Sequence, residues 1–176
     1  GDQWGPGDDG APNPALLLEV VERVRAEVGD RVLALRLSCD ELAPWAGLTP
    51  ELAGDIAVVV APLLDLLTVV RGSIFSADAT RPDSHTEPGF NLGLAETIRA
   101  RISDAGCALV AQGSIVEWGQ AEWALGEGDR ADMVEMTRAQ LADADLVSHL
   151  HKGTSDRIRP CILCNQKCRV RDARNP

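Results

Sequence analysis

The sequence contains no tyrosine, and aromatic residues make up only 3% of its 176 residues. No apolar stretch approaches the roughly 18 residues that a membrane-spanning helix needs. The first five residues, GDQWG, contain neither a basic region nor an apolar run, so they are not typical of a signal peptide. The formal net charge of −10 argues against a nucleic-acid backbone or an anionic membrane surface as the main partner. We therefore expect a cytoplasmic protein.

The hydrophobic content of 45% is enough to give a chain of this length a core. Cysteine stands out, because there are five and three of them lie within residues 161–168. An odd number and tight clustering fit a metal or cluster site better than a disulfide framework.

Strand-length apolar runs alternate with helical patterns four times, at intervals of about 30–40 residues, which is typical of β/α units. The predicted strands span residues 32–38, 64–70, 107–111 and 131–136, and the predicted helices span residues 14–28, 49–61, 92–103, 118–125 and 138–150. The strands are nearly continuous apolar runs, as in parallel sheets covered by helices on their faces. A closed eight-stranded barrel needs roughly 250 residues. The sequence therefore predicts either a small open α/β sheet or half of a larger barrel.

Candidate functional residues follow the predicted strands, because α/β folds place their sites at the carboxyl ends of parallel strands. Arg36 lies within the first strand, and a charge inside an apolar strand needs a partner. Two interpretations stay open. Arg36 forms a structural ion pair with Asp40 or Glu41, or it donates to an anionic or electron-rich ligand.

The third and fourth strands end in residues suited to phosphate. Gly113 and Ser114 follow the third strand, and Thr137 and Arg138 follow the fourth, where a helix is expected to begin. Glycine lets the backbone approach a phosphate closely, helix N-terminal amides point at it, and arginine adds a bidentate contact. The alternative is that these are ordinary turn and cap residues.

The strongest motif is RPCILCNQKC at residues 159–168, in which Cys161, Cys164 and Cys168 have the spacing C-x2-C-x3-C. This spacing suits an iron–sulfur cluster or a zinc ion. Residues 152–176 carry seven Lys and Arg against two acids, and positive charge favours thiolates. Zinc would use His149 and His151 with the first two cysteines and leave the third one spare.

A four-cysteine cluster needs one more ligand than this motif supplies. Cys39 and Cys107 lie in or beside predicted strands and resemble buried small hydrophobic residues. We therefore expect the fourth ligand beyond Pro176.

The cysteine motif resembles that of the 2,4-dienoyl-CoA reductase branch of the old yellow enzyme (NADH:flavin oxidoreductase) family. The likeness covers nearly the whole chain, including residues 2–5, 35–38 and 132–143. The sequence around residues 110–112, 119–125 and 168–176 is similar to that of a mycofactocin-associated subgroup. It implies an α/β fold in which residues 1–158 form the C-terminal half, about strands 5–8, of an FMN-binding (β/α)8 TIM barrel. Residues 159–176 would begin a 4Fe-4S cluster-binding segment.

The same resemblance implies roles for individual residues. Arg36 would contact the flavin ring. The FMN phosphate would be held by Gly113, Ser114, Thr137 and Arg138. The cluster would be bound by Cys161, Cys164 and Cys168. Two departures stand out. Ser114 occupies a position where many relatives have arginine, and no histidine lies near Ser76, where dienoyl-CoA reductases have one; His85 is a substitute candidate.

The resemblance further implies hydride transfer from NAD(P)H through FMN to an electron-poor C=C bond of a small-molecule substrate. The tyrosine that donates the proton is expected before Gly1, and a C-terminal FAD and NAD(P)H module would supply electrons through the cluster. The fragment would be inactive alone. The alternative function is a zinc-stabilised α/β interaction module.

Overall fold

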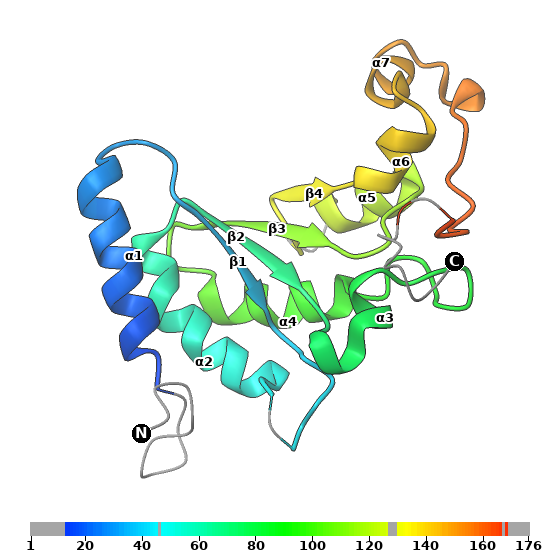
Figure 1. Cartoon of the computed structure of the whole chain (residues 1–176). Helices are drawn as coiled ribbons and strands as arrows, with labels where there is room; N and C mark the ends of the chain where they lie inside the picture. Colours follow the sequence, from blue (N-terminus) through cyan, green and yellow to red (C-terminus); the bar gives the residue numbers. More distant parts are fainter. Residues whose placement is uncertain (1–12, 46, 127–129, 167, 169–176) are drawn as a thin grey trace.

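A computed structural model describes residues 13–45, 47–126, 130–166 and 168. Its centre is a four-stranded sheet in the order β1-β2-β3-β4, and every neighbouring pair is parallel (Figure 1). The strands are β1 (Ala34–Ser38), β2 (Leu66–Val70), β3 (Ala108–Gln112) and β4 (Met133–Glu135). Because sequential strands are neighbours and parallel, each connection must cross over, as in consecutive β/α units. The predicted α/β class is confirmed.

Helices connect and follow the strands as the periodicity predicts, with bounds that differ by a few residues. They are α1 (Ala15–Val28), α2 (Pro50–Val60), α3 (Ala77–Thr80), α4 (Leu92–Ile102), α5 (Trp118–Leu125), α6 (Thr137–Ala142) and α7 (Leu146–His151). Three short 3-10 turns are η1 (Ala61–Leu63), η2 (Ile74–Ser76) and η3 (Ser155–Arg157). The long segment expected to be a loop after β2 thus contains η2 and α3. The loop predicted for the first dozen residues lies outside the described residues.

Local side-chain chemistry explains where two of the helices begin. The Thr49 hydroxyl accepts from the backbone N–H of Leu52, and Pro50 occupies the first helical position of α2. Helix α1 starts one residue later than predicted, and the side chain of Asn13 accepts a hydrogen bond from the N–H of Ala15.

The single helix predicted over residues 138–150 is wrong, because the chain breaks between α6 and α7. Asp143 adopts an extended backbone, and its carboxylate accepts from the backbone N–H groups of Asp145 and Arg159 at 2.9 and 2.8 Å. A buried aspartate that satisfies two backbone donors competes with the helix. These hydrogen bonds hold the pKa of Asp143 below its usual value.

The two faces of the sheet differ. Alternate residues such as Leu67, Val69 and Leu109 are fully buried against a core formed largely by α2 and α4, which lie along the same face (Figure 1). The other residues of the strands are half-buried or exposed and define the open face of the sheet, which carries Arg36, Thr68, Val110, Gln112 and Glu135. The described residues thus cover one face of the sheet with helices, whereas the apolar runs are typical of sheets covered by helices on their faces. The apolar runs arise because the open face is also rich in aliphatic residues.

A repeated device ties the amino ends of the strands together. Before β2, the Asp65 carboxylate accepts from the Leu33 N–H and from Arg25, each at 2.7 Å. Before β4, Asp132 accepts from the Leu109 N–H and from Arg99 at the same distance. Such contacts stabilise the amino-terminal edge of the sheet. In barrel enzymes the functional residues lie at the opposite edge, at the carboxyl ends of the strands. Within the described ranges, no helix is long and apolar enough to cross a membrane.

Candidate functional site at the carboxyl ends of the strands

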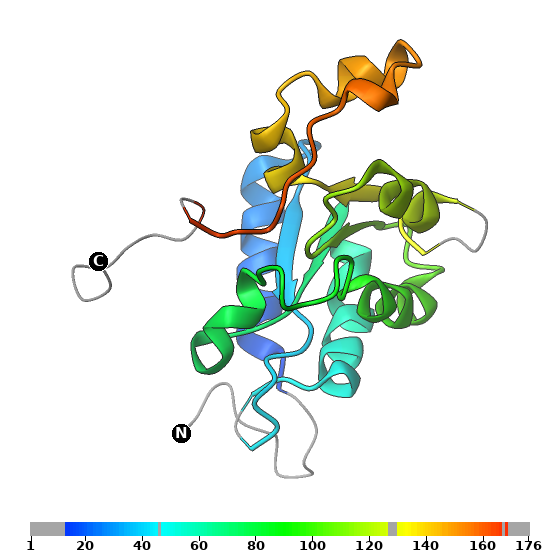
Figure 2. The ribbon, with the colours of Figure 1, turned by 90° about the vertical axis from the view of Figure 1, so that its right-hand side faces the viewer.

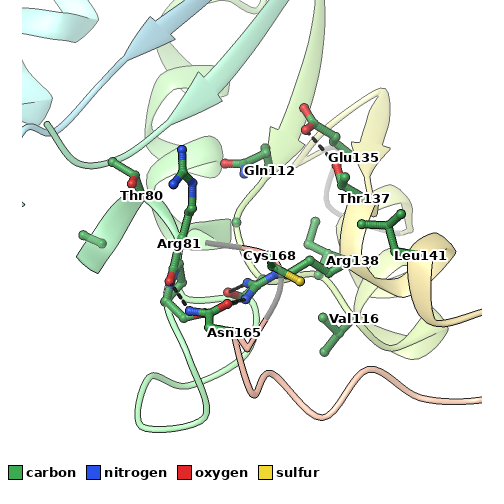
Figure 3. Close-up of a pocket in the computed structure, with 15 residues that line it drawn as sticks. Thr80, Arg81, Gln112, Val116, Glu135, Thr137, Arg138, Leu141, Asn165 and Cys168 are labelled. Atoms are coloured by element: carbon green, nitrogen blue, oxygen red, sulfur yellow. Dashed lines mark hydrogen bonds between the residues drawn. The ribbon is translucent and has the colours of Figure 1, made fainter. Parts of the chain in front are cut away.

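A pocket of about 330 Å³ lies at the carboxyl ends of β3 and β4 (Figure 3). Its walls come from three places far apart in the sequence: the segment around α3, the ends of the two strands, and the cysteine motif. The lining residues are Ala79, Thr80, Arg81, Pro82, Gln112, Gly113, Ser114, Ile115, Val116, Glu135, Thr137, Arg138, Leu141, Asn165 and Cys168. The four residues predicted to hold a phosphate, Gly113, Ser114, Thr137 and Arg138, therefore share one pocket.

Arg138 lines this pocket together with a second arginine, Arg81 (Figure 3). Arg138 Nη2 donates to the Ser114 hydroxyl at 2.8 Å, and its Nη1 donates to the Pro82 carbonyl at 2.6 Å and to Asn165 Oδ1 at 2.9 Å. These bonds use three of the five N–H donors that a guanidinium carries. They hold the planar fork across the pocket, and they include no carboxylate that would neutralise its charge.

The turn after β3 requires the backbone geometry that its residues adopt. Gly113 has φ +127°, and a Cβ there would lie 2.6 Å from the Cβ and Nδ2 of Asn91. Ser114 also has a positive φ, +53°, and is buried. The turn thus depends on glycine at one position and accepts strain at the next.

Beneath this turn, Asn91 is 1% exposed, and its Oδ1 has no hydrogen-bond partner among the described residues. An unsatisfied buried polar atom is costly, and such atoms gather at functional sites. Asn91 was not predicted from the sequence.

Arg36 and Glu135 form an ion pair on the open face, with Nη1 2.6 Å from Oε2. The prediction that Arg36 pairs with Asp40 or Glu41 is wrong. Asp40 pairs with Arg71, and the Glu41 carboxylate accepts from the Leu48 N–H. The expectation failed because Arg36 points to the open face, where β4, three strands along the sheet, supplies the carboxylate of Glu135.

Thr137, at the start of α6, also contacts Glu135, since its hydroxyl donates to Oε1 at 3.1 Å (Figure 3). Glu135 therefore links Arg36 to the pocket. It was not predicted as a site residue, although an acid inside an apolar strand was a visible signal.

The cysteine motif returns to this site after η3, where the chain turns back toward the carboxyl ends of the strands (Figures 1 and 2). The Asp143 carboxylate accepts a hydrogen bond from the Arg159 N–H at the start of the motif. Within the motif, Leu163 is buried. Leu163 and Asn165 both have positive φ, +55° and +52°. Alternation of this kind makes a tight loop, in which backbone N–H groups can turn toward an anion.

The three motif cysteines are unpaired: Cys161 is half-buried, and Cys164 and Cys168 are exposed. No three His, Cys, Asp or Glu side chains of the described residues are gathered as a metal site would require. For the zinc alternative, His149 instead contacts the Thr154 hydroxyl through Nδ1 at 3.0 Å. The thiol donors and their spacing in the sequence are of the type that an iron–sulfur cluster uses.

The other two cysteines behave as small core residues. Cys39 is fully buried, and burial raises its pKa to about 12. Cys107 is 4% exposed, and burial likewise raises the pKa of its thiol. A thiol with a raised pKa is a poor metal ligand and a poor nucleophile.

Ser76, the position where a histidine is missing, and the substitute candidate His85 both lie outside the residues that line the pocket. The Ser76 hydroxyl is buried and donates to the Glu41 carbonyl at 2.7 Å, so this position is structural. His85 is exposed and contacts Asp83 at 2.9 Å.

The side chains and backbone of the pocket have the chemistry that a phosphate-bearing cofactor requires. Arg138 and Ser114 place donors at one point, Gly113 keeps the wall free of a side chain, and no ion pair neutralises the arginine within the described residues. Phosphates bind where backbone, hydroxyl and guanidinium donors converge. The pocket thus gathers donors suited to an anion at the carboxyl edge of a parallel α/β sheet, the edge where barrel enzymes bind phosphate.

Residues 1–157 match the model of the NADH:flavin oxidoreductase / NADH oxidase family, and the chain belongs to that family. It is 31% identical over 153 residues to an NADH oxidase of Thermoanaerobacter brockii, covering 86% of this chain and 23% of the relative. It is 32% identical over 170 residues to an N,N-dimethylglycine/sarcosine dehydrogenase of Chromohalobacter salexigens, covering 93% of this chain and 24% of the relative.

The fold is similar to that of 2-naphthoyl-CoA reductase in complex with 2-naphthoyl-CoA, with a TM-score of 0.80 and 28% identity over 94% of this chain and 24% of that chain. The chain therefore spans about a quarter of the length of the proteins it matches. The predicted likeness to flavin-dependent reductases of the TIM-barrel class is confirmed, and the described residues form part of that fold.

Proposed function

We propose that this chain supplies the phosphate-binding part of an FMN-dependent oxidoreductase that exchanges hydride between NAD(P)H and a small organic substrate. The observation that carries the proposal is the convergence of Arg138 and Ser114 beside the Gly113 turn. FMN is the flavin with one terminal phosphate, and the family match supports a flavin. When bound, the flavin accepts and donates the hydride.

The residues of the chain would orient and charge-balance that cofactor. Ser114, Gly113, Thr137 and Arg138 would hold its phosphate at the carboxyl ends of β3 and β4. Arg36, projecting from β1 on the open face, would donate to the electron-poor end of the ring and stabilise negative charge there. Its ion pair with Glu135 keeps the guanidinium aimed across the sheet.

We further propose that residues 1–158 act as about strands 5–8 of a (β/α)8 barrel. The coverage of relatives supports this, and so does the open face, whose aliphatic side chains have no helix layer over them among the residues that the structure describes. The tyrosine that donates a proton to the substrate, and the FAD and NAD(P)H module, would then belong to parts of the protein outside this chain.

For the cysteine motif, we propose a 4Fe-4S cluster held by Cys161, Cys164, Cys168 and one further cysteine. Three unpaired thiols at cluster spacing support the proposal, and the adjoining segment is basic. Iron and acid-labile sulfide should be present in the full-length natural protein purified without oxygen. A Cys164→Ser variant should lose most of both, whereas a Cys107→Ala variant should retain them; equal loss in the two variants would contradict the assignment.

Two substrate classes remain for this redox centre. The resemblance and the likeness to 2-naphthoyl-CoA reductase favour reduction of an electron-poor C=C bond of an enoyl, dienoyl or enone type. The match to a dehydrogenase of N,N-dimethylglycine and sarcosine favours oxidation of an N-methyl amine. With the full-length protein, a reductase substrate reoxidises the NADH-reduced flavin, whereas an amine bleaches the oxidised flavin without NADH.

The phosphate assignment is tested by FMN affinity. Arg138→Ala should weaken FMN binding about tenfold to a hundredfold, because hydrogen bonds to charged groups contribute about 1.5–3 kcal/mol each. Arg138→Lys should recover only part of the affinity, since lysine keeps the charge and loses the fork. Arg23→Ala, at an exposed arginine of α1, is the control. If Arg138→Ala binds FMN as the unaltered protein does, the site is wrong.

A further inference from the structure

The cysteine segment is fastened to the phosphate site at two points on either side of its first two cysteines. On one side, the Arg159 N–H donates to Asp143, directly after α6, at 2.8 Å. On the other side, Asn165 Oδ1 accepts from Arg138 Nη1 at 2.9 Å. Helix α6 begins beside the phosphate pocket and ends at Ala142, directly before Asp143. The same short helix thus supports both the pocket and the loop.

Asn165 uses both ends of its side-chain amide. Its oxygen accepts from Arg138, and its Nδ2 donates to the Arg81 carbonyl at 2.6 Å (Figure 3). Arg138 Nη1 reaches the neighbouring Pro82 carbonyl as well. The amide therefore joins the cysteine loop, the segment after α3 and the phosphate arginine in one hydrogen-bonded unit.

The backbone at Asn165 is suited to this task. Its φ of +52° lies in the left-handed region, which asparagine enters more readily than other residues with a side chain. This conformation belongs to the cysteine loop itself, one residue after Cys164. A change in the conformation of the loop would therefore move the amide away from Arg138.

The fork of Arg138 depends on that contact. With Nη1 committed to Asn165 and the Pro82 carbonyl, and one Nη2 hydrogen directed to Ser114, the remaining donors have a fixed orientation. A guanidinium that is already oriented loses less conformational entropy when it binds an anion.

We propose that Asn165 is a positioning residue of the FMN phosphate site and couples the cysteine loop to that site, so that a loop ordered by its metal centre binds FMN more tightly. The inference rests on the proposed function. Coupling between two binding sites is reciprocal, so FMN should stabilise the loaded loop by the same factor.

The experiment measures the dissociation constant of FMN by flavin fluorescence in the full-length natural protein, both iron-depleted and reconstituted with iron and sulfide. In the unaltered protein, reconstitution should tighten FMN binding. Asn165→Gly removes the amide and tolerates the positive φ; it should weaken FMN binding about tenfold in the reconstituted protein, the effect of losing a charged hydrogen bond. It should also abolish the difference between the two forms.

The control variant is Gln166→Ala, the exposed neighbour in the same loop, which should keep both the affinity and the difference. Asn165→Asp keeps the size of the side chain and serves as a second variant in case Asn165→Gly disturbs folding. Its carboxylate competes with the phosphate for Arg138, so it should also weaken FMN binding. A double-mutant cycle of Asn165→Gly with Arg138→Ala should be strongly non-additive.

Any one of three results would overturn this inference without affecting the proposed function. The first is an FMN affinity of the unaltered protein that does not change on reconstitution. The others are an affinity difference between the two forms that persists in Asn165→Gly, and additive effects in the double-mutant cycle. If the unaltered protein binds no FMN in either form, the proposed function fails instead. The experiment measures FMN affinity, so its result does not depend on catalytic turnover.

Discussion

Arg36 Nη1 on β1 lies 2.6 Å from Glu135 Oε2 on β4, and two strands of the sheet, β2 and β3, lie between them. The ion pair therefore spans the open face and links the position expected to contact the flavin ring with the pocket expected to hold its phosphate. Both side chains are partly exposed, with 53% and 32% of their surfaces accessible. Such pairs contribute little stability, so the pair is better explained by orientation of the arginine.

Glu135→Gln should raise the reduction potential of bound FMN. Removal of the carboxylate leaves the Arg36 charge uncompensated, which favours an anionic reduced ring. We expect a shift of about 10–30 mV, since 30 mV in a two-electron couple corresponds to about 1.4 kcal/mol. Spectroelectrochemical titration of the full-length protein measures it, with Glu19→Gln on α1 as the control. An unchanged or lower potential would contradict the proposed role of Arg36.

Gly113→Ala should destabilise the protein by about 1–3 kcal/mol, because its φ of +127° is strained for alanine and the added Cβ would lie 2.6 Å from Asn91. It should also weaken FMN binding. Gly93→Ala is the matched control in α4, where a Cβ has no neighbour within 4 Å; it should stabilise the protein by about 0.5–1 kcal/mol. Urea unfolding measures both. Equal stability of the two variants would show that the turn is not constrained.

Asp65 should make the stability of the fold fall in acid. Hydrogen bonds from the Leu33 N–H and from Arg25 hold its pKa below the usual value. A carboxyl with a lowered pKa in the folded state stabilises the protein above its unfolded pKa of about 4, and this contribution is lost as the pH falls toward the folded pKa. Asp65→Asn should therefore be less stable at neutral pH and should show a shallower decline between about pH 5 and 3.

The measurement for Asp65 is the free energy of unfolding as a function of pH. The control is Glu27→Gln on the exposed face of α1, which should follow the unaltered protein throughout. Parallel curves for Asp65→Asn and the unaltered protein would mean that this carboxylate does not contribute to acid sensitivity.

The five cysteines should separate into two groups when the iron-depleted protein is treated with iodoacetamide near pH 8. The three motif cysteines should react, since Cys164 and Cys168 are exposed and Cys161 is half-buried. Cys39 is fully buried with a pKa raised to about 12, so almost no thiolate forms and it should remain unmodified, as should the buried Cys107. Peptide mass spectrometry identifies the modified sites.

Reconstitution with iron and sulfide should protect Cys161, Cys164 and Cys168 from the same reagent without affecting the buried pair. Alkylation of the motif cysteines at equal rates with and without reconstitution would argue against the cluster.

Local patterns in the sequence were enough to predict the α/β class, four parallel strands and the two strand ends that meet in the pocket. The reason is physical: apolar runs of strand length, caps such as Thr49 before Pro50 and the glycine at 113 act over a few residues. The cysteine spacing is likewise a local property. Element ends were less predictable, because Asp143 breaks the last helix through a contact with Arg159, sixteen residues away.

Only the tertiary structure decided which side chains meet. The partner of Arg36 is Glu135, ninety-nine residues away, and the partner of Arg138 in the cysteine loop is Asn165. Neither pairing could be derived from spacing, because each depends on the order and register of the strands and on the turn of the chain after η3. The sequence by itself thus determined the elements and the residue types of the site. The folded sheet decided their partners, since contacts between distant residues form only when the chain has closed on itself.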